Sequence, residues 1–160
     1  MLFEIVRKES DAHIGVSMKH EITLEKNPAA QDVEALRHGL LGHMQSLLGE
    51  TSSNDIAFLL RDDRGAVQGG VHGNYGSFGW LHIDTLFVAD HLRGRGYANQ
   101  LMNLIEAEAV RNGCRYAYLD TFSFQAPEFY KRRGYTVFAE LEDFPAGHTR
   151  YFLRKKLEAR

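Results

Sequence analysis

The sequence predicts one α/β domain, built on a single mixed β-sheet with helices on both faces. The chain has 160 residues, 44% of them hydrophobic and 25% charged, which is enough for one domain with its own core. Short runs with the two-residue alternation of strands are interleaved with runs that repeat apolar residues at helical spacing. Their order is a strand and a helix, a meander of strands, then helix, strand, helix and two closing strands, and it fits one mixed sheet.

The N-terminal part of this pattern supplies one strand and one helix. The alternating run at 21–25 is expected to be the first strand of the sheet. Asn27 and Pro28 are expected to begin a helix, because asparagine can cap a helix and proline suits its first position. The apolar residues of this helix recur at helical spacing and are expected to lie in the core. They are Val33, Leu36, Leu40, Met44 and Leu47.

Turn residues separate the elements that follow. The segments 62–65 and 74–79 contain glycine and are expected to join strands, and Asn112-Gly113 is expected to end a helix. Cys114 follows this helix end and opens an apolar strand, which indicates a buried structural thiol. The expected strands cover 56–60, 66–73, 80–88, 115–121, 135–140 and 149–155, and the expected helices cover 98–112 and 126–133.

The segment Arg93-Gly94-Arg95-Gly96-Tyr97-Ala98 joins the strand at 80–88 to the next helix. A glycine-rich turn that opens a helix points several backbone N–H groups in one direction, next to the partial positive charge of the helix N-terminus. The two glycines permit close approach of a pyrophosphate, and the two arginines add charge. The spacing is neither that of a P-loop nor the G-x-G-x-x-G of dinucleotide-binding folds. Taken alone, the segment is equally consistent with a tight turn that carries two solvated arginines.

Two motifs together indicate a family. Arg93-x-x-Gly96-x-Ala98 resembles the Q/R-x-x-G-x-G/A acyl-CoA loop of the GNAT superfamily of N-acetyltransferases. The later run Ala126-Pro-Glu-Phe-Tyr-Lys-Arg-Arg-Gly-Tyr135 resembles the second signature of that family, A-x-x-F-Y-x-x-x-G-F/Y. The resemblance covers residues 21–157 and implies a GNAT domain over 18–160. Such a domain has a mixed, mostly antiparallel central sheet of about seven strands.

The resemblance also implies acetyl-CoA as the co-substrate, with no metal. Main-chain groups of Leu86, Phe87 and Val88 would hold the pantetheine arm and the acetyl carbonyl, and the glycine-rich loop would cradle the pyrophosphate. Ser123 occupies the place where relatives often carry an asparagine that contacts the cofactor. A hydroxyl can retain one hydrogen bond of that amide but not its paired pattern.

Acetyl transfer from a thioester to an amine needs a neutral amine and a proton for the leaving thiolate. Tyr130 matches the family position of a tyrosine beside the cofactor sulfur; the alternative is an aromatic residue that packs on the sheet, as expected of Phe129. His82 matches the position of the glutamate base in the histone-acetylating branch, and a histidine can accept an ammonium proton at neutral pH. Asp84 shares a strand face with His82 and would orient it or relay the proton through water. Ordinary structural roles for both residues, with water as the base, are the alternative.

Acidic residues before the last strand point to a cationic acceptor. Glu140, Glu142 and Asp143 precede His148 in the region that the resemblance places beside the acceptor cleft. Carboxylates there suit a polyamine, an aminoglycoside-like ring or a lysine side chain. A solvated acidic loop is equally consistent with the pattern.

Composition limits the partners and the compartment. A net charge of −2 argues against nucleic-acid binding through general basicity. The single cysteine rules out an internal disulfide and fits a reducing cytosol, so a cytoplasmic location is expected. No apolar run approaches the length needed to span a membrane, and the N-terminus lacks a signal-peptide pattern, so no membrane association is expected.

The predicted function is therefore an N-acetyltransferase that moves an acetyl group from acetyl-CoA to a primary amine by direct attack in a ternary complex. Residues 1–17 are expected to be an addition to the domain, dispensable for cofactor binding, that forms an edge hairpin or a homodimer contact. The alternative function is a non-catalytic acyl-CoA-binding regulatory module on the same fold. A nucleotide-binding regulatory domain is disfavoured by the loop spacing.

Overall fold

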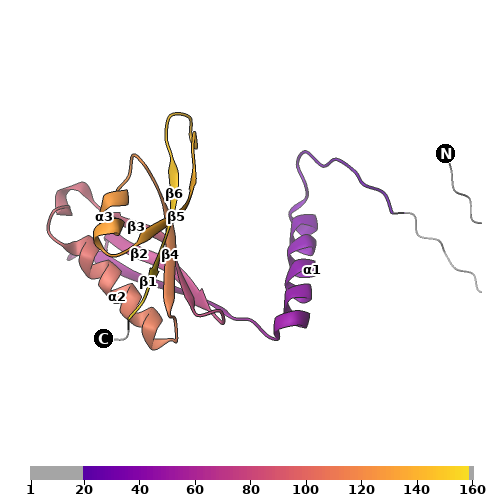
Figure 1. Ribbon diagram of the computed structural model, residues 1–160, viewed down its shortest axis with the longest axis horizontal. Coiled ribbons are helices and arrows are strands. Elements are labelled where there is room, and N and C mark those ends of the chain that lie inside the picture. The colour runs from indigo at the N-terminus through magenta and orange to yellow at the C-terminus, as the bar shows by residue number, and fades with distance from the viewer. Residues whose placement is uncertain (1–19, 159–160) are drawn as a thin grey trace, which may run out of the picture. The chain divides into compact units, whose positions relative to one another are not determined.

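The computed structural model describes residues 20–158 (Figure 1). The chain divides after His43 into two compact units. The expectations for residues 1–17 lie outside the described residues. No helix in the described part of the chain has the length and apolar character needed to cross a membrane.

The N-terminal unit corrects two expectations. The run at 21–25 forms no strand. An alternating pattern favours a strand, but the strand is stable only when a neighbouring strand pairs with it. The helix predicted after Pro28 does form, as α1 (Ala30–Leu48). Within its own unit the apolar stripe forms no core, because α1 has no buried residue and Leu36, Leu40 and Leu47 are exposed.

The C-terminal unit is one open sheet in the strand order β1-β2-β3-β4-β6-β5. All neighbours pair antiparallel except β3 and β4, which pair parallel. The predicted fold class is confirmed, with six strands among the described residues in place of about seven. The strands are β1 (Ser53–Arg61), β2 (Val67–Gly76), β3 (Trp80–Val88), β4 (Tyr116–Phe122), β5 (Thr136–Leu141) and β6 (Arg150–Lys156).

Two helices complete this unit, α2 (Tyr97–Arg111) between β3 and β4 and α3 (Pro127–Arg132) between β4 and β5. A helical crossover is what a parallel strand pair requires. In Figure 1, α2 runs along one face of the sheet, and it packs on β1, β2 and β3. The predicted end of α2 is confirmed, because Gly113 follows it with a φ of +84°, a conformation that favours glycine.

The core lies between α2 and the sheet. Every second residue of β4, and of β3 up to Ile83, faces it, as the strand period requires. Cys114 is also buried, and burial raises the pKa of its thiol, so it stays protonated as expected of a structural cysteine. The largest fully buried side chains are Tyr135, Leu81, Met102, Ile105, Leu119, Leu153 and Val71.

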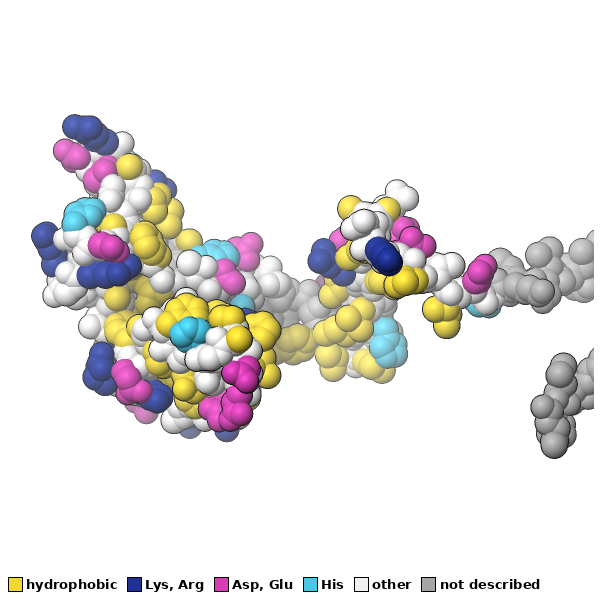
Figure 2. All heavy atoms as spheres, turned by 90° about the horizontal axis from the view of Figure 1, so that it is seen from above, with side chains coloured by type: hydrophobic (Ala, Val, Ile, Leu, Met, Phe, Trp, Pro, Cys, Tyr) yellow, Lys and Arg dark blue, Asp and Glu magenta, His cyan; other side chains and the backbone are white. Residues whose placement is uncertain are grey.

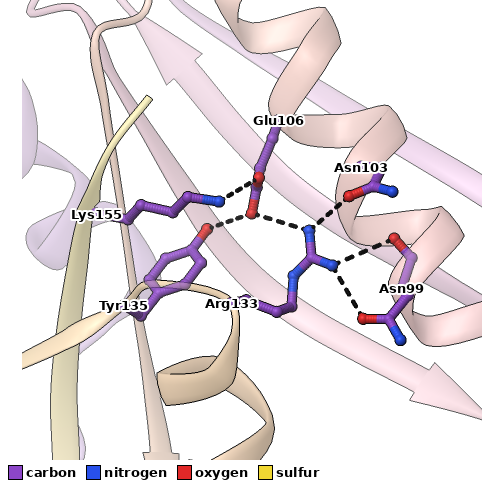
Figure 3. Close-up of polar contacts among 6 residues, drawn as sticks. All are labelled: Asn99, Asn103, Glu106, Arg133, Tyr135 and Lys155. Atoms are coloured by element: carbon purple, nitrogen blue, oxygen red, sulfur yellow. Dashed lines mark hydrogen bonds and ion pairs between the residues drawn. The ribbon is translucent and has the colours of Figure 1, made fainter. Parts of the chain in front are cut away.

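A polar network around Glu106 ties α2 to the C-terminal strands (Figure 3). The Tyr135 hydroxyl donates to Glu106 Oε1 at 3.0 Å, and Lys155 Nζ donates to Oε2 at 2.7 Å. Arg133, directly after α3, lies 3.4 Å from Oε1. Burial and the charge of Glu106 raise the pKa of Tyr135, so its hydroxyl keeps the proton that it donates.

Arg133 extends this network along α2. Its guanidinium donates to Asn99 Oδ1 at 3.0 Å and to Asn103 Oδ1 at 2.9 Å. Only 11% of the Arg133 side chain and 12% of the Glu106 side chain are exposed, so both charges depend on these partners. The network therefore fixes α2 against the start of β5 and against β6.

Removing Glu106 should destabilise the fold far more than removing one of its hydrogen bonds. Glu106→Ala leaves Arg133 and Lys155 without their carboxylate and should lower the free energy of unfolding by about 3–5 kcal/mol. Tyr135→Phe removes one hydroxyl and should cost about 0.5–1.5 kcal/mol. Chemical denaturation of each variant measures both values.

The control is the exposed pair of Glu128 and Lys131, 2.7 Å apart. Glu128→Ala should change the free energy of unfolding by less than about 0.5 kcal/mol. A Glu106→Ala cost as small as this control would contradict a structural role for the network.

Candidate active site

The central feature of the candidate site is the point at which β3 and β4 separate. The two strands pair from Trp80 with Tyr116 to Ile83 with Leu119. Beyond this point β3 continues to Val88 without a partner on its β4 side, and β4 continues to Phe122 paired only with β6. One edge of β3 therefore offers main-chain groups to a ligand. This part of β3 contains Leu86, Phe87 and Val88, the residues predicted to hold the cofactor arm, although the Val88 carbonyl already accepts a hydrogen bond from Arg93 Nε.

A β-bulge lies at the same point. On the other edge of β3, His72 of β2 pairs with Thr85, whereas Gly73 pairs with Ile83. Asp84 is therefore the extra residue of the bulge. Bulges increase local twist and redirect side chains, and they are frequent beside active sites.

The glycine-rich loop forms a cavity of about 450 Å³ at the end of this opening. Gly94 and Gly96 have φ values of +73° and +83°, and Gly96 directly precedes α2. The first turn of a helix has N–H groups without intrahelical partners, which suit an anion. The cavity is lined by Val88, Leu92, Arg93, Gly94, Gly96, Tyr97, Ala98, Asn99, Phe129 and Arg132.

The two loop arginines, expected to add charge to the pyrophosphate site, do not both face the cavity. Arg93 turns back onto the loop: its Nε donates to the Val88 carbonyl at 3.0 Å, and its Nη2 lies 2.8 Å from Asp90 Oδ1. Arg93 therefore braces the loop, while Arg95 is outside the cavity lining. Arg132 of α3 lines the cavity instead and was missed in the sequence. Its position three residues after Phe129, on the same helix face, was the available signal.

A larger cavity, of about 610 Å³, lies beside Glu106 and Lys155. It contains none of the residues predicted for the site, so we assign the site to the loop cavity and the separated strands. No group of three or more His, Cys, Asp or Glu residues in the described chain is arranged to hold a metal ion.

Tyr130 extends from α3, next to Phe129 of the cavity lining. Its ring contacts those of Phe129 and Tyr135 edge-on, with centroids 5.1 and 6.1 Å away. Its hydroxyl makes no hydrogen bond within the described residues. Burial, and then the charge of Asp120, raise the pKa of Tyr130. The hydroxyl is therefore held protonated and is available to donate a proton.

Asp84 contacts a histidine that the sequence reasoning did not single out. Its Oδ2 accepts a hydrogen bond from Thr85 Oγ1 at 2.9 Å and lies 3.4 Å from His72 Nδ1. These hydrogen bonds, that of Thr85 first, lower the pKa of Asp84, so its carboxylate is ionised at neutral pH. His82 stacks on Tyr118 with ring centroids 4.6 Å apart and lowers the Asp84 pKa only through its charge. His72 was missed because only the strand register brings it to Asp84.

Ser123 joins the end of β4 to the β5–β6 connection. Its N–H donates to the Thr149 carbonyl at 2.8 Å, and its Oγ accepts from Thr149 N at 3.2 Å. Oγ also lies 3.4 Å from His148 Nδ1. Asp143, one of the three predicted acceptor carboxylates, accepts from Gly147 N at 3.1 Å within the same connection, while Glu140 and Glu142 are exposed. These bonds order the connection beside the strand opening.

The chain is similar to known acetyltransferases in both sequence and structure. Residues 20–135 match the model of the acetyltransferase (GNAT) family. The chain is 33% identical over 127 residues to an acetyltransferase of Agrobacterium fabrum, covering 79% of this chain and 92% of that protein. It is 40% identical over 96 residues to blasticidin-S acetyltransferase of Streptomyces morookaense, covering 59% and 70%. A crystal structure of an acetyltransferase from Bacillus cereus matches with a TM-score of 0.77 at 36% identity, covering 84% and 98%.

The cavity assignment predicts a position-specific effect of a branched side chain in the loop. At Gly96 an added Cβ would meet no atom within 4 Å and would project into the space proposed for phosphate. We expect Gly96→Val to weaken acetyl-CoA binding about ten- to a hundredfold, through lost charge-assisted hydrogen bonds. Isothermal titration calorimetry measures this affinity.

The matched control is Gly65→Val in the β1–β2 turn. Gly65 has a φ of +81°, close to the +83° of Gly96, and is also free of neighbours within 4 Å. Both variants should lose stability alike, because left-handed backbone costs a non-glycine residue about 1–2 kcal/mol. Equal acetyl-CoA affinity in the two variants would show that the loop assignment is wrong.

Proposed function

Because this chain belongs to the acetyltransferase (GNAT) family, we propose that it transfers the acetyl group of acetyl-CoA to a primary amine of a small molecule or peptide. The observation that carries this proposal is Tyr130, a protonated hydroxyl without a hydrogen-bond partner among the described residues, whose ring contacts Phe129 of the loop cavity. A binding module would not need such a group. The names of the relatives, acetyltransferases in each case, support the same reaction class.

The proposed reaction is direct attack in a ternary complex. The backbone of the 93–98 loop binds the pyrophosphate, and the free edge of β3 aligns the thioester. The amine loses a proton to a base of the protein, and its nitrogen lone pair forms a bond with the acetyl carbon. The bond between that carbon and sulfur then breaks. Tyr130 donates its proton to the leaving thiolate.

We assign the base to His72, oriented by Asp84. An ionised carboxylate only accepts hydrogen bonds, so His72 Nδ1 donates to Asp84 and Nε2 keeps a lone pair for the ammonium proton. The His82 ring has a different setting: its Nδ1 lies 3.5 Å from the Asn74 amide nitrogen, and the ring stacks on Tyr118. We therefore propose His72 in place of His82 as the base, and Asp84 keeps its orienting role.

Turnover of acetyl-CoA with a panel of amines tests the function. Release of free CoA thiol, read with a thiol reagent, should occur with at least one primary amine. The panel should span polyamines, aminoglycosides, amino acids and lysine peptides. Binding of acetyl-CoA without turnover of any amine would favour the alternative, a non-catalytic acyl-CoA-binding module.

Tyr130→Phe should lower turnover roughly 10²- to 10⁴-fold, the usual contribution of a positioned acid. Acetyl-CoA affinity should barely change, because the hydroxyl acts on charge that develops during the reaction. The raised pKa of Tyr130 keeps it protonated below its folded-state value, so wild-type activity should not fall through Tyr130 ionisation between neutral pH and about pH 10. Initial rates against the amine found in the panel measure both effects.

Tyr116→Phe is the control, at the other end of β4 from the opening. It removes a hydroxyl in the same way and should leave turnover near the wild-type value. If Tyr130→Phe behaves like this control while chemistry limits the rate, water is the proton donor and Tyr130 has no part in the mechanism.

The assignment of the base predicts different activities for two histidine variants. His72→Gln should lower kcat/KM by roughly 10²- to 10⁴-fold, because it removes the group that accepts the ammonium proton. Initial rates at one fixed neutral pH measure this loss.

His82→Gln is the companion variant. It should lose little activity, because the base is intact. A large loss in His82→Gln, with His72→Gln near the wild-type rate, would return the base to His82.

A further inference from the structure

We propose that the cluster around Arg150 is an acceptor subsite for a carboxylate, so that the preferred acceptors are flat, apolar amines that also carry an anionic group. This inference rests on the proposed acetyl transfer and names the substrate class of that site. Four features of the C-terminal unit carry it: an arginine surrounded by aromatic rings, its unused donors, its position at the opening between β3 and β4, and the ordered segment that holds the rings.

Arg150 lies in an aromatic enclosure on the sheet. Its guanidinium carbon is 5.5 Å from the ring centroid of Phe122, 5.7 Å from that of Phe144 and 5.3 Å from that of Phe152. Its Nε donates to Asp120 Oδ2 at 2.7 Å. Aromatic faces and a flat guanidinium together form a planar, partly desolvated surface.

The guanidinium retains donors for a ligand. Within the described residues, Nε makes the only hydrogen bond of the Arg150 side chain, and Nη1 and Nη2 make none. A guanidinium has five N–H donors in a rigid plane that matches two carboxylate oxygens. The side chain is 30% exposed, so a ligand can reach the unused edge.

The cluster borders the opening between β3 and β4. Asp120, which pairs with Arg150, is the first residue of β4 beyond the last pair with β3. Its charge also raises the pKa of Tyr130, the proposed proton donor. Asp84 holds the equivalent position on β3, directly after that last pair. An acceptor could thus place its amine towards Asp84 and its carboxylate on Arg150.

The rim of the cluster is apolar, exposed and ordered. Phe124 and Phe144 are 56% and 47% exposed, and both rings stack on Phe122, with centroids 5.2 and 6.3 Å away. Figure 2 shows that hydrophobic side chains reach the surface of this unit. The backbone bonds between Ser123 and Thr149 hold the segments that carry these rings. Exposed aromatic groups beside a half-buried charge can form a ligand site.

The test compares two acceptors that differ only in a carboxylate, 4-(aminomethyl)benzoate and benzylamine. With acetyl-CoA and the wild-type protein, kcat/KM should be about ten- to a hundredfold higher for the carboxylated amine, the range expected of a charge-assisted hydrogen bond. Arg150→Gln should remove this preference. Equal use of both amines by wild type, or an unchanged preference in Arg150→Gln, would overturn the subsite.

Arg154→Gln is the matched control. Arg154 is also on β6 and also stacks on an aromatic ring, that of Phe138 at 5.5 Å, but no carboxylate of residues 20–158 forms an ion pair with it. This variant should keep the preference. Because each result is a ratio of two acceptors on one protein, partial loss of folded protein does not change it.

A binding measurement separates the subsite from the catalytic proposal. 4-(Acetamidomethyl)benzoate should bind wild type about ten- to a hundredfold more tightly than N-benzylacetamide in calorimetry, and this difference should vanish in Arg150→Gln. If no amine is acetylated but this difference is seen, the proposed function fails and the subsite stands. If the two compounds bind equally, the subsite is wrong whatever the enzyme acetylates.

Discussion

The whole site depends on the separation of β3 and β4 after Ile83 and Leu119. A parallel pair normally continues its hydrogen bonds along both strands, and their loss here leaves one edge of β3 unpaired. An exposed unpaired strand edge can pair with another chain and cause aggregation, so its presence here suggests that a ligand occupies it. In this chain the opening ends at a glycine-rich loop and the N-terminus of α2, which supply an anion site.

The groups assigned to chemistry belong to the elements that border this opening or, for His72, to β2 on the other edge of β3. The bulge turns Asp84 towards His72 on one side, and Asp120 begins the free end of β4 on the other. Tyr130 comes from α3, whose end is fixed to α2 through Arg133 and the Glu106 network. The same network also binds β6, the strand that carries Arg150. A rigid frame of this kind holds catalytic groups more closely than loops alone could.

Local signals in the sequence predicted most of the fold. The strand Trp80–Val88 has the bounds expected from its apolar pattern, and Gly113 ends α2 as expected from its Asn-Gly pair. The run at 21–25 was wrongly predicted as a strand, because a strand needs a partner that no local pattern supplies. The apolar stripe of α1 does form a helix, but periodicity alone does not say what covers it. In the site, the register of β2 on β3 was the missing information, since it brings His72 to Asp84.

The structure of the protein in complex with acetyl-CoA tests the central claim most directly. We expect the pyrophosphate on the N–H groups of the 93–98 loop, the pantetheine arm along the free edge of β3, and the sulfur within hydrogen-bonding distance of the Tyr130 hydroxyl. A cofactor bound elsewhere, for example in the larger cavity beside Glu106 and Lys155, would contradict the account. So would a complex in which β3 and β4 pair along their full length and leave no room between them.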